Sequence, residues 1–208
     1  MRITVIMPSF LGEYQGCATD RERKFERAVQ SFLNQSYPNR QLIIISDGCE
    51  ITNNLVRTKF NHELIKLVSI EKQPTFSGIV RQAGLEAADG DFITYLDADD
   101  IYKDNNHLEV IVNGFKQHDC DWIYFNDYIK YFHLDHLPLA ERNAQLNQGE
   151  IGTSNIAHKN KKDISWIGCE GYGHDFTFIM NMKNKYPNFT KISGTSYTVC
   201  HIPNSVDV

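Results

Sequence analysis

The sequence predicts an α/β fold in which a mostly parallel sheet is flanked by helices. Apolar, β-branched runs alternate with amphipathic helical spacings along the chain. Short polar stretches follow directly after three of the apolar runs. The chain has 208 residues, of which 41% are hydrophobic and 23% are charged, and this composition suits one soluble domain over residues 1–208.

The strands of the first half are expected at apolar runs that do not alternate with polar residues. Such runs are typical of strands that are buried on both faces of a sheet. They cover residues 3–8 and 41–46, and a third and a fourth strand are expected over residues 64–70 and 91–96. Sheets of this kind bind ligands beyond the carboxyl ends of their strands.

Helices are predicted between these strands, where apolar residues recur at helical spacing. The first helix follows Thr19 and Glu22, whose spacing predicts a capping box, and it continues to Leu33. The remaining helices are expected, in order, over residues 50–60, over residues 78–89 behind Ser77 as a cap, and from Leu108 to Phe115.

The alternation of strands and helices ends with a fifth strand, and the pattern changes after residue 132. Residues 121–132 are rich in aromatic residues that half alternate with polar ones, so we expect one long edge or antiparallel strand. Residues 141–163 are polar, with few large apolar groups, and are expected to form a mobile loop or a lid. Apolar spacing from His174 onward predicts another helix, and residues 196–202 predict a final strand.

Charge and composition exclude several classes of protein. The formal net charge of −5 gives the chain no overall attraction for nucleic acid. No apolar run approaches the ~18 residues of a membrane span, and the first ten residues are unlike a signal peptide. The five cysteines are scattered without a C-x-x-C pair, which favours a reducing compartment. His133 and His136 lack further ligands for zinc and are expected at the surface.

Three carboxylates stand at the end of the fourth predicted strand. Asp97, Asp99 and Asp100 occupy three of four consecutive positions. Because Asp is a favoured helix cap, they could serve only to start the next helix. Alternatively they bind Mg²⁺ or Mn²⁺, which takes one or two protein carboxylates together with substrate phosphates. Residues 8–10 and Asp47 follow two other strands at the same rim, and this favours a ligand site.

Several ordered motifs together resemble those of one family. The segments SFLNQSYPN with LIIISDG, then AADGDFITYLDADD, then WIGCEGYGHDFTFI occur in this order. They resemble the family 2 glycosyltransferases, which have the GT-A fold, a Rossmann-like sheet with a C-terminal acceptor-side segment. The resemblance is strongest over residues 1–115, where it implies a nucleotide-sugar-binding part. It is looser over residues 150–200, and it implies an acceptor-side part over residues 116–208.

The resemblance implies a set of nucleotide-contacting residues. They are, in chain order, Pro8, Ser9, Phe10, Asp47, Arg81 and Asp97. The first three would cradle the base, and Asp47 would contact the base or ribose. Arg81 would approach the nucleotide or its diphosphate, or would be an ordinary surface residue of its helix. Asp97 would touch the ribose or the metal shell. The chain departs from the family at Ser46, where a second acid is usual, and at Gln82, where Asn is usual.

The resemblance also implies a metal ion and a catalytic base. Asp99 would bind Mn²⁺ or Mg²⁺, which stabilises a departing diphosphate. His201 would be an extra metal ligand or a structural histidine. Asp175 would take the proton of the acceptor hydroxyl, or would only cap its helix, and its neighbour is His174 where the family usually has Glu. Trp166 would stack on an acceptor sugar or lie buried.

These residues imply an inverting glycosyltransferase that moves a sugar from a nucleoside-diphosphate sugar, by resemblance a UDP-sugar, to a glycan or lipid-linked acceptor. The resemblance and the lack of an export signal imply a cytoplasmic location, with any membrane contact peripheral. A catalytically silent sugar-nucleotide-binding protein is an alternative. A D-x-D phosphatase normally opens with that motif at its first strand, and a nucleotidyltransferase would need basic residues within residues 8–16, which have none. The sugar, the linkage and the oligomeric state stay open.

Overall fold

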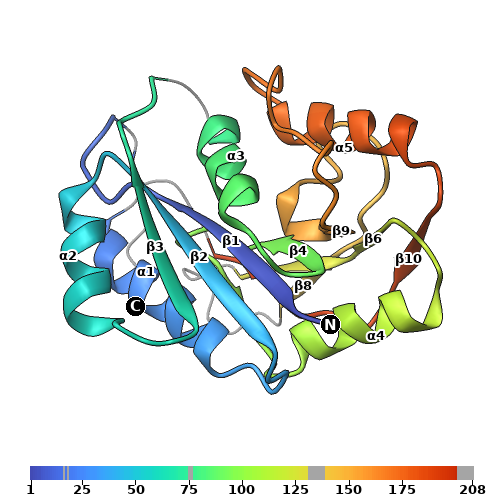
Figure 1. The fold of residues 1–208 in the computed structure, drawn as a ribbon, viewed down its shortest axis with the longest axis horizontal. Helices are drawn as coiled ribbons and strands as arrows, with labels where there is room; N and C mark the ends of the chain where they lie inside the picture. Colours follow the sequence, from blue (N-terminus) through green and yellow to red (C-terminus); the bar gives the residue numbers. More distant parts are fainter. Residues whose placement is uncertain (16, 18, 75–76, 131–138, 201–208) are drawn as a thin grey trace.

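The central feature of the structure is a seven-stranded sheet with helices on both faces (Figure 1). The structure is a computed structural model and describes residues 1–200 apart from residues 16, 18, 75–76 and 131–138. In spatial order the strands are β10 (Phe189–Ile192), β6 (Trp122–Phe125), β9 (Ile156–Lys159), β4 (Phe92–Tyr95), β1 (Ile3–Ser9), β2 (Arg40–Asp47) and β3 (Ile65–Ile70). All neighbours are parallel except that β9 is antiparallel to β4 and β6, so the predicted mostly parallel α/β fold is confirmed.

Helices cover the two faces of this sheet. They are α1 (Arg21–Leu33), α2 (Glu50–Lys59), α3 (Gly78–Ala87), α4 (His107–Gln117) and α5 (His174–Lys185). Successive strand residues point to opposite faces. Met7 and Leu42 therefore pack with α1, α2 and α4, whereas Ile6 and Ile43 pack with α3 and α5. In Figure 1, α3 and α5 lie above the sheet and α1 and α4 lie below it.

A second, four-stranded sheet joins the segments that follow β4 and β6 to the C-terminal strand. Its strands, in spatial order, are β5 (Ile101–Tyr102), β11 (Tyr197–Val199), β7 (Asp127–Ile129) and β8 (Ala140–Arg142). The prediction of a final strand is confirmed over the three residues of β11. The pairing places β11 beside the carboxylate segment: Asp100 accepts hydrogen bonds from the Tyr197 hydroxyl at 2.8 Å and from the Cys200 backbone at 2.7 Å.

The second half of the chain corrects two predictions. The single strand expected over residues 121–132 divides at Asn126 into β6 and β7. β6 is an inner strand and not an edge, because β10 and β9 flank it, but its antiparallel pairing with β9 confirms the antiparallel alternative. The loop or lid expected over residues 141–163 contains the buried strand β9, with Ile156 and Ala157 fully inaccessible. The lid prediction is therefore wrong for this strand.

The polar residues in and before β9 explain that error, because each has a partner inside the fold. His158 is fully buried; its Nδ1–H donates to the Lys159 carbonyl and its Nε2 accepts from the Tyr95 hydroxyl, both at 2.9 Å. Asn155 is also fully buried and donates to the Phe125 carbonyl at 3.1 Å. Polar groups that are paired in this way can be buried at little cost.

Two helix starts differ from the predicted caps. The N-cap of α1 is Asp20 and not Thr19, and no side chain caps the helix, so the predicted capping box is wrong. Asp20 has a left-handed backbone with φ of 54°, whereas a capping side chain requires an extended residue at this position. Ser77 does stand at the N-cap of α3, but its hydroxyl accepts from Arg81 instead of capping the helix.

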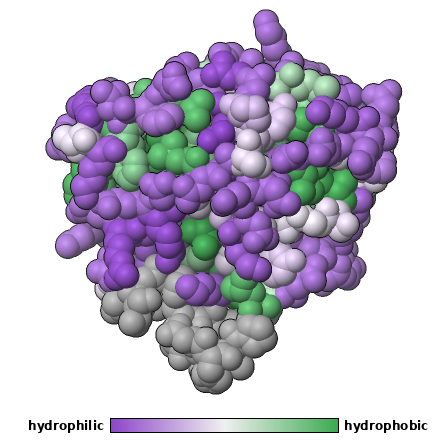
Figure 2. Space-filling model, turned by 90° about the horizontal axis from the view of Figure 1, so that it is seen from below, coloured by the Kyte–Doolittle hydropathy of each residue, from purple (hydrophilic) through white to green (hydrophobic). Residues whose placement is uncertain are grey.

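Hydrophilic residues dominate the face of the molecule shown in Figure 2, and hydrophobic residues form small, separate areas on it. The large apolar side chains that are exposed among the described residues are Met1, Tyr14, Ile51, Ile79, Ile167 and Tyr172. Within the same part of the chain, no helix combines the length and the apolarity needed to cross a bilayer.

Candidate active site

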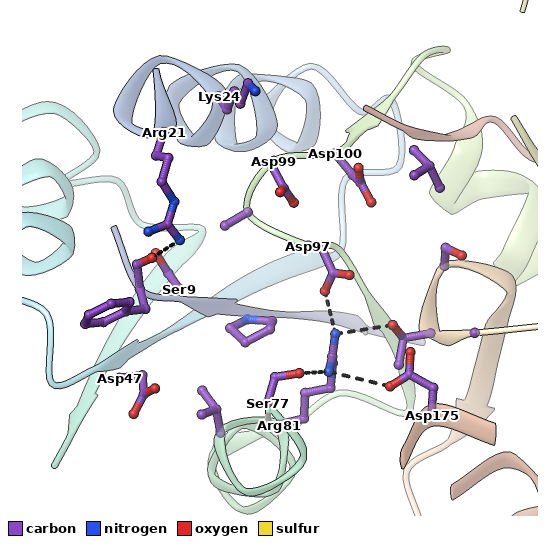
Figure 3. A pocket seen from close by; sticks show the side chains of 18 of the residues that line it. Ser9, Arg21, Lys24, Asp47, Ser77, Arg81, Asp97, Asp99, Asp100 and Asp175 are labelled. Carbon is purple, nitrogen blue, oxygen red and sulfur yellow. Dashed lines mark hydrogen bonds and ion pairs between the residues drawn. The ribbon is translucent and has the colours of Figure 1, made fainter. Parts of the chain in front are cut away.

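A cleft of about 950 Å³ opens at the carboxyl ends of β1, β2 and β4 (Figure 3). Predicted site residues from distant parts of the chain line it together: Pro8, Ser9, Phe10, Asp47, Arg81, Asp97, Asp99 and Asp175. His201, the predicted additional metal ligand, lies outside the described residues, as do His133 and His136. The cleft is also lined by residues that sequence reasoning missed, namely Arg21, Lys24, Lys72, Arg142 and Thr153.

Two donors hold Asp47 at the end of β2. The Lys72 Nζ lies 2.6 Å from its Oδ2, and the Gln73 backbone N–H donates to its Oδ1 at 2.7 Å. The same Lys72 nitrogen lies 4.4 Å from the centre of the Phe10 ring, which is a cation–π distance. Lys72 therefore ties the ends of the first two strands together. In the sequence it is one lysine after a strand, which is typical of an ordinary surface residue.

Cations from the first turns of α1 border the same end of the cleft. The guanidinium of Arg21 donates to the backbone carbonyls of Phe10 and Gly12, and it lies 4.8 Å from the centre of the Tyr14 ring. Lys24 lines the cleft although only 1% of the residue is exposed. This end of the cleft thus combines aromatic and cationic side chains.

The three carboxylates after β4 have different surroundings. Asp100 is buried, and Tyr197 and Cys200 hold its two oxygens. Burial raises the pKa of Asp100 well above its ordinary value, and the charges of Asp99 and Asp97 act in the same direction. None of the three caps a helix, because the N-cap of α4 is Asn106. The capping interpretation of this cluster is therefore wrong.

Asp97 and Asp99 are the carboxylates that fit a divalent cation. Both line the cleft with hard oxygen ligands, while the oxygens of Asp100 are already bonded. The described residues contain no group of three or more His, Cys, Asp or Glu that could enclose a metal. Mg²⁺ and Mn²⁺ commonly bind through one or two carboxylates and complete their shell with water and substrate phosphates. The donor set fits such an ion and does not fit a closed structural site.

Arg81 is the hub of the cleft. Only 4% of its side chain is exposed. Its Nη2 donates to Asp97 at 2.6 Å and to the Thr153 hydroxyl at 3.3 Å, and its Nη1 donates to Ser77 and lies 3.8 Å from Asp175 (Figure 3). Burial acts to lower the pKa of Arg81, but the charges of Asp97 and Asp175 outweigh it and raise the pKa. Arg81 therefore stays charged between two carboxylates.

Asp175 lies in the first turn of α5, whose N-cap is Gly173 and which no side chain caps. The capping alternative is therefore wrong. Its Oδ1 lies 2.7 Å from the Nε2 of His174. Burial acts to raise the pKa of Asp175, but the hydrogen bond from His174 and the charge of Arg81 outweigh it and lower the pKa to about 2. Asp175 is therefore ionised at neutral pH.

Trp166 does not reach the cleft. It is 1% exposed, its ring stacks on Phe178 with centres 3.8 Å apart, and its Nε1–H donates to the Tyr95 hydroxyl at 3.3 Å. The buried alternative for Trp166 is confirmed, and acceptor stacking is wrong. Thr153 does reach the cleft, but only because β9 enters the sheet and fixes the turn before it. No sequence motif marks that turn.

The fold places the chain in the GT-A class, because solved structures with the GT-A fold share it. With S. aureus TarS 1–349 in complex with UDP, the TM-score is 0.73 at 16% identity, covering 97% of this chain and 61% of that one. With glucosyl-3-phosphoglycerate synthase from Mycobacterium tuberculosis, in complex with Mn²⁺, UDP and glucosyl-3-phosphoglycerate, the TM-score is 0.62 at 12% identity, covering 97% and 73%.

Within that class the chain belongs to glycosyltransferase family 2, because the sequence model described as "Glycosyl transferase family 2" matches residues 5–190. An uncharacterised glycosyltransferase of Haemophilus influenzae is 36% identical over 118 residues, covering 53% of this chain and 41% of the relative. The Escherichia coli UDP-Glc:alpha-D-GlcNAc-diphosphoundecaprenol beta-1,3-glucosyltransferase WfgD is 27% identical over 124 residues, covering 60% and 45%. The chain spans less than half the length of these two relatives.

Proposed function

We propose that the cleft transfers a sugar from a nucleoside-diphosphate sugar to an acceptor hydroxyl with inversion at the anomeric carbon. One observation carries this proposal: the buried guanidinium of Arg81 binds Asp97 on the donor side and lies 3.8 Å from Asp175 on the acceptor side. A transferase has to align a departing group with an incoming one, and fixed alignment can supply much of its rate enhancement. Here the single residue Arg81 sets the spacing between Asp97 and Asp175, and so between the departing and the incoming group.

The nucleotide occupies the end of the cleft formed by β1 and β2. Residues 8–10 border the base, and Asp47 accepts from the base or ribose through lone pairs that Lys72 leaves open. Arg21 and Lys72 place positive charge beside the aromatic Phe10. UDP is the proposed nucleotide, and its presence in the TarS complex supports this choice.

Asp99, with Asp97 beside it, would hold Mn²⁺ or Mg²⁺, and His201 is the proposed additional ligand. When bound, such an ion stabilises the charge that develops on a departing diphosphate. The Mn²⁺ in the glucosyl-3-phosphoglycerate synthase complex supports this assignment. Arg81 keeps one oxygen of Asp97 occupied and so leaves the other available toward the cleft.

Asp175 is the proposed base. Its pKa is lowered to about 2, so it is ionised at neutral pH before the substrate binds, and it would take up the proton of the hydroxyl as that hydroxyl attacks. Arg81 and His174 hold its carboxylate in place. The hydroxyl belongs to a glycan or to a lipid-linked sugar, and the lipid-linked acceptor in the name of WfgD supports the second choice. Contact with a membrane is then peripheral or through a partner.

A thermal-shift panel tests the donor site. UDP, GDP, dTDP and CMP are added singly, each with and without Mn²⁺. A ligand at a hundredfold excess over its Kd adds about 2.7 kcal/mol of apparent stability. We expect one nucleoside diphosphate to stabilise the chain, and more so with Mn²⁺. No stabilisation by any nucleotide would contradict the proposal.

Asp175→Asn then separates a transferase from a silent sugar-nucleotide binder. We expect the variant to be stabilised by the nucleotide as the wild type is. The rate of nucleoside diphosphate release from the matching nucleotide sugar should fall at least about 10²-fold. Asp121→Asn is the control, since Asp121 pairs with Lys161 and does not line the cleft. If the wild-type chain binds the nucleotide but releases no nucleoside diphosphate from the nucleotide sugar, with or without added acceptors, the result would favour the silent binder.

A further inference from the structure

Arg142 enters the cleft from a part of the fold that the proposed mechanism does not use. It is the last residue of β8, it lines the cleft, and 35% of its side chain is exposed. Its register partner on β7 is Asp127, which is fully buried. A carboxylate without solvent access lies behind a guanidinium that faces the solvent of the cleft.

The contacts of this pair orient the guanidinium. The Nε of Arg142 donates to Asp127 Oδ1 at 2.8 Å, and its Nη2 donates to the other carboxylate oxygen. The Ser154 hydroxyl, itself 8% exposed, donates to Asp127 Oδ2 at 2.7 Å and so fixes the carboxylate. One edge of the planar guanidinium is therefore occupied, and the buried carboxylate of Asp127 fixes its position.

The other end of the Arg142 guanidinium has no partner within the described part of the chain: no residue there accepts from Nη1. The other two arginines that line the cleft differ. Arg21 donates from both terminal nitrogens to backbone carbonyls, and Arg81 donates from both to Ser77 and Asp97. Arg142 thus keeps a charged donor for a ligand.

The turn before β9 joins this donor to the proposed catalytic groups. Ser154 contacts the Asp127–Arg142 pair, and its neighbour Thr153 accepts from Arg81 at 3.3 Å. Asp100 is the other acidic residue whose charge acts on Arg142, and both of its oxygens are already bonded. Asp127 therefore pairs with the Nε and Nη2 edge of Arg142, and no carboxylate in the described wall of the cleft contacts its Nη1.

We propose that Arg142 binds a phosphoryl group of a substrate, with Asp127 and Ser154 as its positioning residues. Arginine held on one edge presents its remaining N–H groups in the geometry that phosphate oxygens accept. The inference rests on the proposed function, which gives the group two sources: the diphosphate of the donor, or a phosphate carried by the acceptor. A cross-strand pair with only a structural role would stabilise β7 and β8 without affecting either ligand.

The test uses the double variant Asp127→Asn/Arg142→Gln. It removes one negative and one positive charge, so the net charge is unchanged and no unpaired carboxylate stays buried. Arg142→Lys is the second variant, which keeps the charge but loses the planar edge. Arg57→Gln is the control, because Arg57 pairs with Glu50 on α2 and does not line the cleft. Thermal unfolding shows that each variant folds.

Calorimetric titration with UDP, or with whichever nucleoside diphosphate stabilises the wild type, distinguishes the sources. If Arg142 binds the donor, the Kd of the nucleoside diphosphate rises about tenfold or more in both variants while that of the nucleoside alone is unchanged. If it binds the acceptor, that Kd is unchanged, and inorganic phosphate binds the nucleotide-loaded wild type at least about tenfold more tightly than the variants.

Unchanged affinities for both ligands in a folded double variant would overturn the proposal. A wild type that binds no nucleoside diphosphate would instead refute the proposed function. In that case inorganic phosphate is titrated into the chain without nucleotide. Binding that the Arg142 variants lose, and that Arg57→Gln keeps, would still support a phosphoryl site, and no difference would overturn it.

Discussion

The guanidinium of Arg81 is surrounded by groups that depend on its charge. Asp97 follows β4, whereas Asp175 belongs to α5, so the two carboxylates have no shared element to hold them in place. Without Arg81 they would face each other across the cleft with no cation between them, and Thr153 would lose its donor. The shape of the cleft and its electrostatic balance therefore depend on the same side chain.

Arg81→Met is expected to lower the free energy of unfolding by about 3 kcal/mol, the lower end for breaking a buried ion pair, because the carboxylates are partly exposed. Arg81→Lys restores part of this stability but cannot reach Asp97 and Asp175 together, so donor turnover falls at least about tenfold. Urea denaturation and nucleoside diphosphate release measure the two effects. Arg57→Met, in an exposed pair, should cost under about 1 kcal/mol; an equal cost at both sites would refute the argument.

The candidate site was predictable where a residue's position in the chain reveals its place in the fold. Asp47 and Asp97 follow buried strands, and such positions meet at one rim of a parallel sheet. Arg81 was predicted at the site, but its burial depends on Thr153 and Asp175, which the chain brings in from far away. Arg142 carries no local signal, because its orientation comes from a buried partner on another strand.

At the scale of elements, β9 completes both the sheet and the cleft. It separates β4 from β6, and the turn before it supplies Thr153 and Ser154 to the cleft. Its polar residue His158 is held in a chain of hydrogen bonds: Trp166 donates to Tyr95, and Tyr95 donates to His158. Composition predicts a loop for such a segment, and only long-range partners make it a strand.

The buried histidines make stability depend on pH. Burial lowers the pKa of His158 to about 4 and that of His107 to about 3. Below pH 6.5 these two histidines bind protons in the unfolded chain but not in the folded chain. Their contribution to the free energy of unfolding is therefore complete above pH 6.5 and is lost as the pH falls towards 4. We expect urea midpoints to drop between pH 7.5 and 5, and to drop less in His158→Gln. An equal drop of the midpoint in the wild type and in His158→Gln would show that His158 does not contribute to the pH dependence.

Helix α3 packs so closely on β1 that a glycine is required. A Cβ at Gly84 would collide with the side chain of Ile6, which is fully buried. Although Ala is the better helix former, Gly84→Ala is expected to destabilise the fold by about 1–3 kcal/mol. Gly114→Ala in α4 is the matched control, because its Cβ would lie 3.2 Å from the far end of Ile192 and costs little. Chemical denaturation measures the stability of both variants. If Gly84→Ala proved more stable than Gly114→Ala, the close packing at Gly84 would not require a glycine.

At the scale of the whole molecule, one sheet runs through both halves of the chain. Strands from the first half, β1 to β4, and from the second half, β6, β9 and β10, share continuous hydrogen bonding. The two apolar cores on either face likewise contain residues from both halves. Within the described residues, the two halves of the chain therefore share one sheet and both apolar cores.

Calorimetry can test that continuity. We expect one unfolding transition with equal calorimetric and van't Hoff enthalpies, because neither half has a complete core. A saturating nucleoside diphosphate should move the whole transition upward, although its proposed contacts lie mainly in the first half. Two separate unfolding transitions, of which the nucleotide shifts only one, would contradict the prediction that both halves unfold together.

The fold was predictable where local patterns and tertiary structure agree. The first four strands and the helices between them follow from apolar runs and helical spacing, although β3 is an edge strand without a fully buried residue. The second sheet was missed, because strands such as β5, with two residues, are too short to leave a pattern. The capping box failed because Asp20, and not Thr19, is the N-cap of α1, and its left-handed backbone does not suit a capping side chain.

The place of β9 in the sheet has a consequence for the order of events during synthesis. On the ribosome, β1 to β4 emerge first and can pair with one another, but the free side of β4 has to wait for residues 156–159. At the usual speed of translation this wait is on the order of seconds. Throughout it, a hydrophobic strand edge is open to pairing with other nascent chains. The most vulnerable moment of this protein therefore falls before its active-site cleft exists.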